Sequence, residues 1–257
     1  RDSVIDTTPG TFRVGRNLVK DHRNYGPIDL ARVILKSSNV GVSKIALSLP
    51  KEDFWGFFSH MGFGEPTSTG FPGEVGGQLA PYRRWAEIDQ ATLAFGYGLS
   101  VTALQLARAY GVLASDGIRF PVSLVQTGEP VRGERVMSAE TARTVRRMME
   151  AVISDEGTAP AAAVPGYRVA GKTGTAKKSI SGGYAEDRYI SVFAGIAPAS
   201  DPRLVMVVMI DEPSAGKYYG GSVAAPVFSR VMTGALRLLN IAPDAVDEQI
   251  VKMAALG

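Results

Sequence analysis

The sequence predicts an α/β fold of the α+β kind, in which an antiparallel sheet has helices on both faces. Two apolar runs, at 189–197 and 204–210, are separated by only a few residues, so they are expected to form a hairpin. The run at 204–210 is apolar throughout, which is typical of a strand covered on both faces. An amphipathic segment at 224–239 supplies a helix for one of these faces.

The elements before the hairpin follow from caps, chain breakers and apolar periodicity. Residues 1–25 show turns and short extended pieces without a helical period. Asp29 can cap the first helix and Ser138 a later one. The Gly- and Pro-rich stretch 64–82 is expected to be a long loop, and 180–188 a polar connection. Helices are expected at 30–36, 40–49, 51–61, 87–95, 102–114 and 138–153, and a strand at 169–178.

The composition narrows the function classes. The net charge of +3 comes without a basic stripe interleaved with aromatic residues, so nucleic-acid binding has no support. Cysteine is absent, which excludes disulfides, thiolate catalysis and zinc–thiolate sites, and no metal or cofactor is expected. No apolar run reaches membrane-spanning length, and the start Arg1-Asp2-Ser3 is neither a signal peptide nor an initiator methionine. The chain is therefore expected to begin inside a longer protein.

The segment Lys172-Thr173-Gly174-Thr175 combines a cation, two hydroxyls and a glycine in one predicted strand. Because side chains alternate along a strand, Lys172 and Gly174 share one face, and Thr173 and Thr175 the other. A glycine inside a strand often marks the close approach of a ligand or a second backbone. A substrate carboxylate could meet the lysine and the hydroxyls, and the Thr175 N–H would be left for a developing oxyanion. The alternative is a strand that ends in a glycine turn with a solvated lysine.

A Ser-x-Asn pair, Ser37 and Asn39, lies where two predicted helices meet, about 130 residues before the lysine strand. Such a pair is common at average residue usage, and its simplest role is helix capping. Its combination with the Lys-Thr-Gly-Thr strand and the hairpin after that strand makes capping alone an insufficient interpretation.

Together these features resemble the second and third motifs of the penicillin-recognising serine acyltransferases. Phe95-Gly96-Tyr97-Gly98-Leu99-Ser100-Val101-Thr102 is similar to the stretch between these motifs in class B penicillin-binding proteins. Phe193-Ala194-Gly195-Ile196-Ala197-Pro198 and Asp211-Glu212-Pro213 are similar to the strands after the third motif. The resemblance is strongest to the division-type (penicillin-binding protein 3) group. It implies a transpeptidase domain at 1–240, incomplete at its N-terminus, and a C-terminal tail at 241–257.

One motif of the family is missing. Its chemistry needs a Ser-x-x-Lys at the start of a buried helix upstream of Ser37, and residues 1–36 contain none. Ser48-Leu49-Pro50-Lys51 has a proline where that helix would run, and Ser214-Ala215-Gly216-Lys217 lies on a glycine turn. The nucleophilic serine is therefore expected upstream of this chain, with the first strands of the sheet and any membrane anchor.

The resemblance implies a peptidoglycan D,D-transpeptidase of septal wall synthesis that is acylated by β-lactams. An upstream serine would attack a D-alanyl-D-alanine stem peptide, release D-alanine and pass the acyl group to an amine of a neighbouring strand. In this chain Ser37 would relay protons, Asn39 would bind the substrate amide, and Lys172 would supply positive potential. The Thr175 N–H would form half of the oxyanion hole. The implied substrate- or β-lactam-binding residues are Thr173, Gly174, Thr175, Tyr97, Lys177, Tyr218 and Tyr219, the last four with ordinary packing as the alternative.

The resemblance also implies partners, a location and competing functions. The partners are stem peptides, β-lactams and membrane proteins of the division machinery, including a glycan-polymerising glycosyltransferase. The catalytic domain would lie in the periplasm, attached to the inner membrane. One alternative is a β-lactamase-like hydrolase or penicillin sensor, for which Glu65 and Glu74 in the long loop could activate water. The other is a non-catalytic division scaffold.

Overall fold

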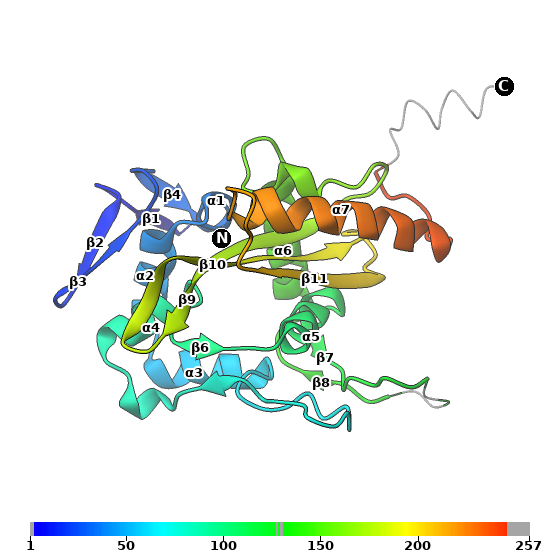
Figure 1. Ribbon diagram of the computed structural model, residues 1–257, viewed down its shortest axis with the longest axis horizontal. Coiled ribbons are helices and arrows are strands. Elements are labelled where there is room, and N and C mark those ends of the chain that lie inside the picture. Colours follow the sequence, from blue (N-terminus) through cyan, green and yellow to red (C-terminus); the bar gives the residue numbers. More distant parts are fainter. Residues whose placement is uncertain (1–2, 127, 129–130, 246–257) are drawn as a thin grey trace. The chain divides into compact units, whose positions relative to one another are not determined.

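The computed structural model describes residues 3–126, 128 and 131–245 (Figure 1). The chain divides into two compact units, residues 1–141 and 142–257. The first unit contains β1 (Val4–Asp6), β2 (Thr11–Val14), β3 (Asn17–Lys20), β4 (Pro27–Asp29), α1 (Leu30–Lys36), α2 (Asn39–Leu47), α3 (Lys51–His60), β5 (Gln78–Leu79), the 3₁₀ helix η1 (Tyr82–Arg84), α4 (Glu87–Leu93), β6 (Leu99–Ser100), α5 (Ala103–Ala114), β7 (Ile118–Arg119) and β8 (Glu134–Arg135). From α6 (Ala139–Glu150), which begins at the boundary, the second unit continues with η2 (Ala151–Ile153), η3 (Pro160–Ala162), β9 (Ala170–Ile180), β10 (Gly183–Ala197), β11 (Leu204–Asp211) and α7 (Gly220–Leu238).

Side chains cap helices α1 and α5 of the first unit, and the cap of α1 at Asp29 is predicted from the sequence. Asp29 accepts a hydrogen bond from the Arg32 N–H at 2.7 Å and starts α1. Thr102 and Gln105 form a reciprocal capping box at the start of α5. The Gln105 amide also donates to the carbonyls of Glu65 and Gly76, at 2.8 and 2.7 Å. The first turn of α5 therefore holds both ends of the long loop that precedes it.

The extended pieces near the start pair as two small antiparallel ribbons, β1 with β4 and β2 with β3. α2 packs against α4, where the Ser43 hydroxyl donates to the Ala91 carbonyl at 3.1 Å. The Gln90 amide donates to the Ala46 carbonyl at 2.8 Å. An apolar cluster joins the β2–β3 ribbon to both helices through Val14, Val19, Val40 and Ala91. These contacts fix the start of α2 against the end of β3.

The second unit is built on a three-stranded antiparallel sheet of order β11-β10-β9. The predicted hairpin is confirmed, with Phe193 opposite Val208. α7 covers one face, where the Phe193 and Phe228 rings meet edge to face at 4.8 Å (Figure 1). Ala194 and Ile196 point to the opposite face and are fully buried too. Both faces of β10 are therefore covered, as predicted for the sheet.

Two expectations about this sheet were wrong. The polar stretch 180–188 is not a simple connection, because β9 and β10 continue through it to a tight turn, with an irregular register between Tyr184 and Tyr189. Polar residues are tolerated there because this end of the hairpin is exposed. The strand covered on both faces is β10 and not β11, in which Met209 is 54% exposed. Apolar composition does not show whether a strand lies at the edge or in the centre of a sheet. The small residues of β10 allow neighbouring elements to pack more closely against it.

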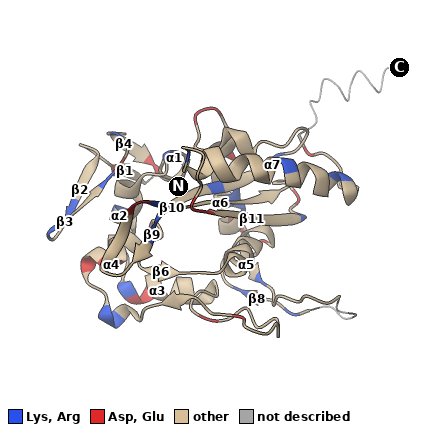
Figure 2. Cartoon of the chain, in the orientation of Figure 1, with Lys and Arg blue, Asp and Glu red and all other residues tan. Residues whose placement is uncertain are grey.

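Along the described part of the ribbon, Lys and Arg positions are interspersed with Asp and Glu positions (Figure 2). None of the helices in the part of the chain that the structure describes is long and apolar enough to cross a membrane.

Candidate active site

The junction between α1 and α2 contains the Ser-x-Asn pair. Its middle residue, Ser38, is the N-cap of α2, since its Oγ accepts from the Gly41 N–H at 2.8 Å. The Ser38 hydroxyl donates to Asp21 Oδ2 at 2.6 Å. Ser38, with Asp21, therefore caps the start of α2. Ser37 is the C-cap of α1, and its N–H donates to the Ile34 carbonyl at 3.2 Å, so capping accounts for the position of both serines.

Ser37 and Asn39 flank this cap and are held by other contacts. Ser37 has a φ of 55°, in the left-handed region, which costs about 1–3 kcal/mol for a residue other than glycine. The Asn39 amide donates to the Lys20 carbonyl at 3.1 Å. Asp21 Oδ1 accepts from the backbone N–H that follows Asn39, at 3.0 Å. The end of β3 therefore fixes Asn39 and the start of α2, and Asp21 was not anticipated from the sequence.

β9 forms an edge of the sheet and contains the Lys-Thr-Gly-Thr segment. Thr173 and Thr175 face α7: the Gly220 N–H, at the start of α7, donates to Thr175 Oγ1 at 3.0 Å. Thr173 Oγ1 lies 2.9 Å from Thr158 Oγ1 in a hydrogen bond. The Lys172 side chain leaves the strand on the opposite face, as strand alternation requires. Its Nζ nevertheless reaches to 3.5 Å from Thr173 Oγ1, so the cation and this hydroxyl lie close together at the edge of the strand.

Lys172 is half-buried, and its Nζ donates to the Thr173 carbonyl at 3.2 Å. Burial lowers the pKa of Lys172 from its usual 10.5 to about 8. The ammonium therefore remains mostly protonated at neutral pH, and its charge acts in a poorly solvated place, where electrostatic interactions are stronger than in water.

Two glycines allow the start of α7 to approach β9. A Cβ on Gly220 would collide with the carbonyl oxygens of Gly174 and Val192, and one on Gly221 with that of Thr158. The close approach places the Gly220 N–H on the Thr175 hydroxyl, which accepts and keeps its own proton for donation elsewhere. Sequence reasoning missed Thr158 and Gly220, although the Gly-Gly pair before an apolar-periodic segment was a usable signal.

Gly174 is not required by packing inside the chain. A Cβ built on it would meet the Val192 Cβ at 3.5 Å, an ordinary van der Waals distance, and no other atom more closely. The chain itself therefore leaves room for a side chain at this position in the strand. The choice of glycine is consistent with something from outside the chain lying against the strand there.

Tyr218 and Tyr219 belong to an aromatic group beside the sheet. The Tyr218 ring stacks on Tyr189 with centroids 4.1 Å apart and planes 12° apart, and Tyr219 lies 4.6 Å from Tyr218. Hydrogen bonding between the Tyr218 and Tyr219 hydroxyls, and then burial, raise the pKa of Tyr219. Tyr189, which was not predicted, is opposite Lys177 in the β9–β10 register. The aromatic group therefore continues the face that bears the two threonines.

The remaining predicted binding residues differ in their surroundings. Lys177 is exposed on β9, whereas its neighbour Lys178 forms ion pairs with Asp211 and Glu212 at 3.0 and 2.7 Å. Tyr97 belongs to the first unit, where its ring lies 5.9 Å from that of Phe95.

The two serines that were rejected as nucleophiles are Ser48 and Ser214, and neither is placed as the serine of a Ser-x-x-Lys motif would be. Ser48 is the C-cap of α2 and donates to the Ile45 carbonyl at 2.7 Å. Lys51 donates to the Trp85 carbonyl at 2.8 Å. Ser214 and Lys217 are exposed in the connection between β11 and α7. Neither pair presents the serine and lysine of a Ser-x-x-Lys on one helical face.

Glu74 organises the long loop instead of facing a reaction site. Its carboxylate accepts hydrogen bonds from the Thr67 hydroxyl and, at 2.9 Å, from the Thr69 N–H. These bonds, that from Thr67 above all, lower the pKa of Glu74, which makes the carboxylate a weaker base. Among the described residues, no group of three or more His, Asp or Glu side chains is arranged to hold a metal ion.

The predicted site residues fall into two sets. Ser37, Asn39 and Tyr97 lie in the first unit. The second unit brings the threonines and Gly174 together with the start of α7, next to the tyrosine group, and Lys172 lies on the opposite face of the same strand. β9 therefore combines a half-buried lysine, two hydroxyls and an uncrowded glycine, groups that can form hydrogen bonds and an ion pair with a carboxylate.

Comparison with known proteins shows the family to which the chain belongs. Residues 1–233 match the family described as the penicillin binding protein transpeptidase domain. The chain is 47% identical over 245 residues to peptidoglycan D,D-transpeptidase FtsI of Escherichia coli K12, covering 95% of this chain and 41% of that protein. It is 44% identical over 240 residues to the probable peptidoglycan D,D-transpeptidase PenA of Neisseria flavescens, covering 93% and 60%.

A solved structure is similar over nearly the whole chain. The apo transpeptidase domain of penicillin-binding protein 3 from Burkholderia pseudomallei superposes with a TM-score of 0.91 at 44% identity, covering 95% of this chain and 74% of that one. The chain belongs to the transpeptidase-domain family of penicillin-binding proteins, in its class B, penicillin-binding protein 3 type.

Proposed function

We propose that the protein containing this chain is a peptidoglycan D,D-transpeptidase that cross-links stem peptides through a serine acyl-enzyme and is acylated by β-lactams. The observation that carries the proposal is β9, which presents Lys172, Gly174 and the two threonine hydroxyls on an edge strand. The names of the relatives support the reaction class. The chain spans 41% of the length of the Escherichia coli relative, and the nucleophilic serine is supplied by a segment outside residues 1–257.

Donor binding follows from the surroundings of the threonines. The terminal carboxylate of a D-alanyl-D-alanine peptide accepts hydrogen bonds from Thr173 and Thr175. The Thr175 hydroxyl is oriented for this role because it already accepts from Gly220 and has one proton left. Lys172 contributes positive potential from within the strand. The absence of a side chain at Gly174 lets the peptide backbone lie against β9.

Acyl transfer uses the groups that stabilise charge and move protons. The Thr175 N–H is half of the oxyanion hole, and one such donor typically changes the rate by about 10²–10³. Asn39 binds the amide of the acyl compound. Ser37 relays a proton, first to the leaving D-alanine amine and then from the attacking amine of the second strand. The left-handed backbone of Ser37 follows from its position as the C-cap of α1, where the helix ends and the chain turns into α2.

The proposal is tested by the intact mass of two proteins after exposure to a penicillin. One is this chain, and the other is extended upstream by about a hundred residues to include a Ser-x-x-Lys. The long form should gain one drug mass and the short form none. Acylation of the short form would instead make Ser48 or Ser214 the nucleophile, and no acylation of a folded long form would refute the proposal.

The hydrolase alternative is weakened by Glu74, whose carboxylate is occupied by the loop. A transpeptidase should release bound penicillin over hours, whereas a β-lactamase releases it within its catalytic cycle. The scaffold alternative predicts no acylation at all.

We also propose that the catalytic domain works in the periplasm, attached to the inner membrane, with division-machinery membrane proteins that include a glycan-polymerising glycosyltransferase. Cell-wall substrates lie outside the inner membrane, which supports the location. Co-purification of a glycosyltransferase with the membrane-extracted protein tests the partnership.

A further inference from the structure

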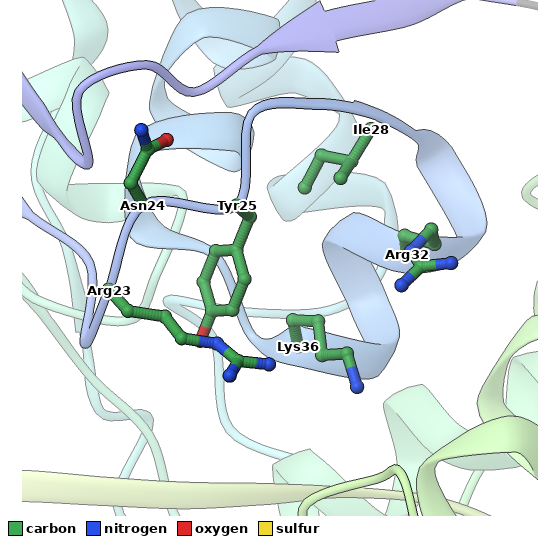
Figure 3. Close-up of a pocket in the computed structure, with 6 residues that line it drawn as sticks. All are labelled: Arg23, Asn24, Tyr25, Ile28, Arg32 and Lys36. Atoms are coloured by element: carbon green, nitrogen blue, oxygen red, sulfur yellow. The ribbon is translucent and has the colours of Figure 1, made fainter.

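A pocket of about 180 Å³ in the first unit has the side chains of three cations at its rim. Figure 3 shows Arg23 and Tyr25 on one side of the opening, Arg32 and Lys36 on the other, and Ile28 above them. Asn24 also lines the pocket, but its side-chain oxygen accepts from the Gly26 N–H at 2.9 Å and is used by the local turn.

The lining of this pocket is positive and contains no carboxylate. Within the described ranges, neither the Arg23 nor the Arg32 guanidinium forms an ion pair. Two acids belong to the same segment: Asp21 uses its two oxygens on Ser38 and on the Val40 N–H, and Asp29 caps α1 by accepting from the Arg32 N–H at 2.7 Å. Like charges around one opening repel each other unless an anion lies between them, and guanidinium groups bind carboxylates through paired hydrogen bonds.

Parts of the pocket are oriented before any ligand arrives. The Arg23 guanidinium lies over the Tyr25 ring, 5.4 Å from its centre, which limits the positions that this flexible side chain adopts. Burial, and then the charge of Asp21, raise the pKa of Tyr25, so its phenol remains a hydrogen-bond donor near neutral pH. An anion would therefore meet a placed guanidinium and a phenol donor as well as the charges of Arg32 and Lys36.

The pocket adjoins the Ser-x-Asn junction in the same unit. Its residues come from the segment between β3 and β4 and from α1, and Lys36 directly precedes Ser37. In the proposed reaction two peptides are needed. The carboxylate of the donor is bound by β9, whereas the carboxylate at the end of the acceptor peptide has no assigned site. Ser37 is the residue that would take the proton from the acceptor amine.

We propose that the pocket formed by Arg23, Tyr25, Arg32 and Lys36 binds a carboxylate of the acceptor stem peptide. The inference rests on the proposed transpeptidase function and adds a second, separate carboxylate site to it. Removing one guanidinium should weaken acceptor binding by about tenfold, the usual value of a charge-assisted hydrogen bond.

The experiment uses the longer, acylation-competent protein and measures transfer from a thioester donor to a peptide acceptor over a range of acceptor concentrations. The variants are Arg23→Gln and Arg32→Gln. The matched control is Arg16→Gln, which removes the same charge from the exposed turn between β2 and β3. Each protein is assayed with the acceptor as a free acid and with its carboxyl groups amidated. The rate of acylation by penicillin is measured in parallel, as the check on folding.

The expected result is a raised KM for the acid acceptor in both pocket variants and an unchanged KM in Arg16→Gln. The amidated acceptor should bind weakly to every protein, with no further loss in the variants. Equal KM values in all proteins, or equal losses for acid and amidated acceptors, would overturn the inference. If inorganic phosphate competes for the pocket without affecting acceptor KM, the pocket binds a different anion and the inference also fails. Failure of the wild-type protein to react with penicillin would refute the proposed function itself.

Discussion

At the scale of single residues, the three neighbouring residues of the Ser-Ser-Asn junction have different roles. Ser38 caps α2 and is buried against Asp21, so its role is explained by folding. Ser37 is the C-cap of α1, and the Asn39 amide is bound to the Lys20 carbonyl. The sequence pattern predicted the junction correctly, but it could not show which of the two serines is the cap, because both are equally good N-cap residues.

Replacing Ser38 with alanine is expected to lower the free energy of unfolding by about 1–2 kcal/mol, because the cap is lost and Asp21 loses a partner. Thermal or urea unfolding measures this. Ser48→Ala, at an exposed helix end, is the control and should change stability by less than about 0.5 kcal/mol. Equal effects of the two substitutions would contradict the assignment of the cap.

Lys172 should make stability and activity depend on pH in opposite directions. Its pKa is lowered in the folded state, so between about 8 and 10.5 the unfolded chain binds more protons, and stability rises with pH through this window. Lys172→Met should therefore stabilise the protein at pH 7, on the order of 1–2 kcal/mol, and less above pH 10.

Acylation by penicillin should fall as the pH passes through about 8, because the ammonium that attracts the carboxylate is lost. Lys178→Met is the control on the same strand, since Lys178 pairs with Asp211 and Glu212 outside the proposed site. A flat acylation profile between pH 7 and 9.5 in the wild-type protein would count against the role of Lys172.

At the scale of elements, helices were easier to predict than strands. The bounds of α1 and the caps of α1 and α5 follow from local hydrogen bonding, which the sequence contains. The extension of β9 and β10 through 180–188 and the exposure of Met209 depend on what lies beside each strand. Tertiary neighbours decide strand length and burial, so sequence periodicity alone does not give them.

Two glycines near the β9–α7 contact should respond differently to alanine. Gly220→Ala should destabilise the protein by about 1–3 kcal/mol, because the new Cβ collides with two carbonyl oxygens of the sheet. Gly174→Ala should fold with nearly wild-type stability, since its Cβ has ordinary contacts, and yet react more slowly with penicillin. Unfolding curves and acylation rates measured on both variants test this. Normal acylation of a folded Gly174→Ala protein would show that no ligand lies against the strand.

At the scale of the whole molecule, the predicted site residues belong to both compact units. The sequence could suggest each set, because each belongs to a short local motif. It did not reveal Asp21, Thr158, Tyr189 or Gly220, which support the motifs from distant parts of the chain. Such supporting residues carry no local pattern, and only the fold identifies them.

The loop carboxylate Glu74 provides a prediction at the same scale. Glu74→Gln should lower stability, because the loop loses its charged acceptor, while the release of bound penicillin keeps its slow rate. The release rate is followed by the return of free enzyme after removal of excess drug. A further slowing in this variant would identify Glu74 as the base of a deacylating enzyme.

The most direct test of the central claim is the rate of peptide cross-link formation by the longer protein and by its Lys172→Met and Lys178→Met variants. If β9 binds the donor carboxylate as proposed, Lys172→Met should lose about 10²-fold or more in rate, a few kcal/mol of transition-state stabilisation. Lys178→Met should remain close to wild type. Cross-linking at wild-type rate by folded Lys172→Met, or no cross-linking by the wild-type protein, would contradict the account.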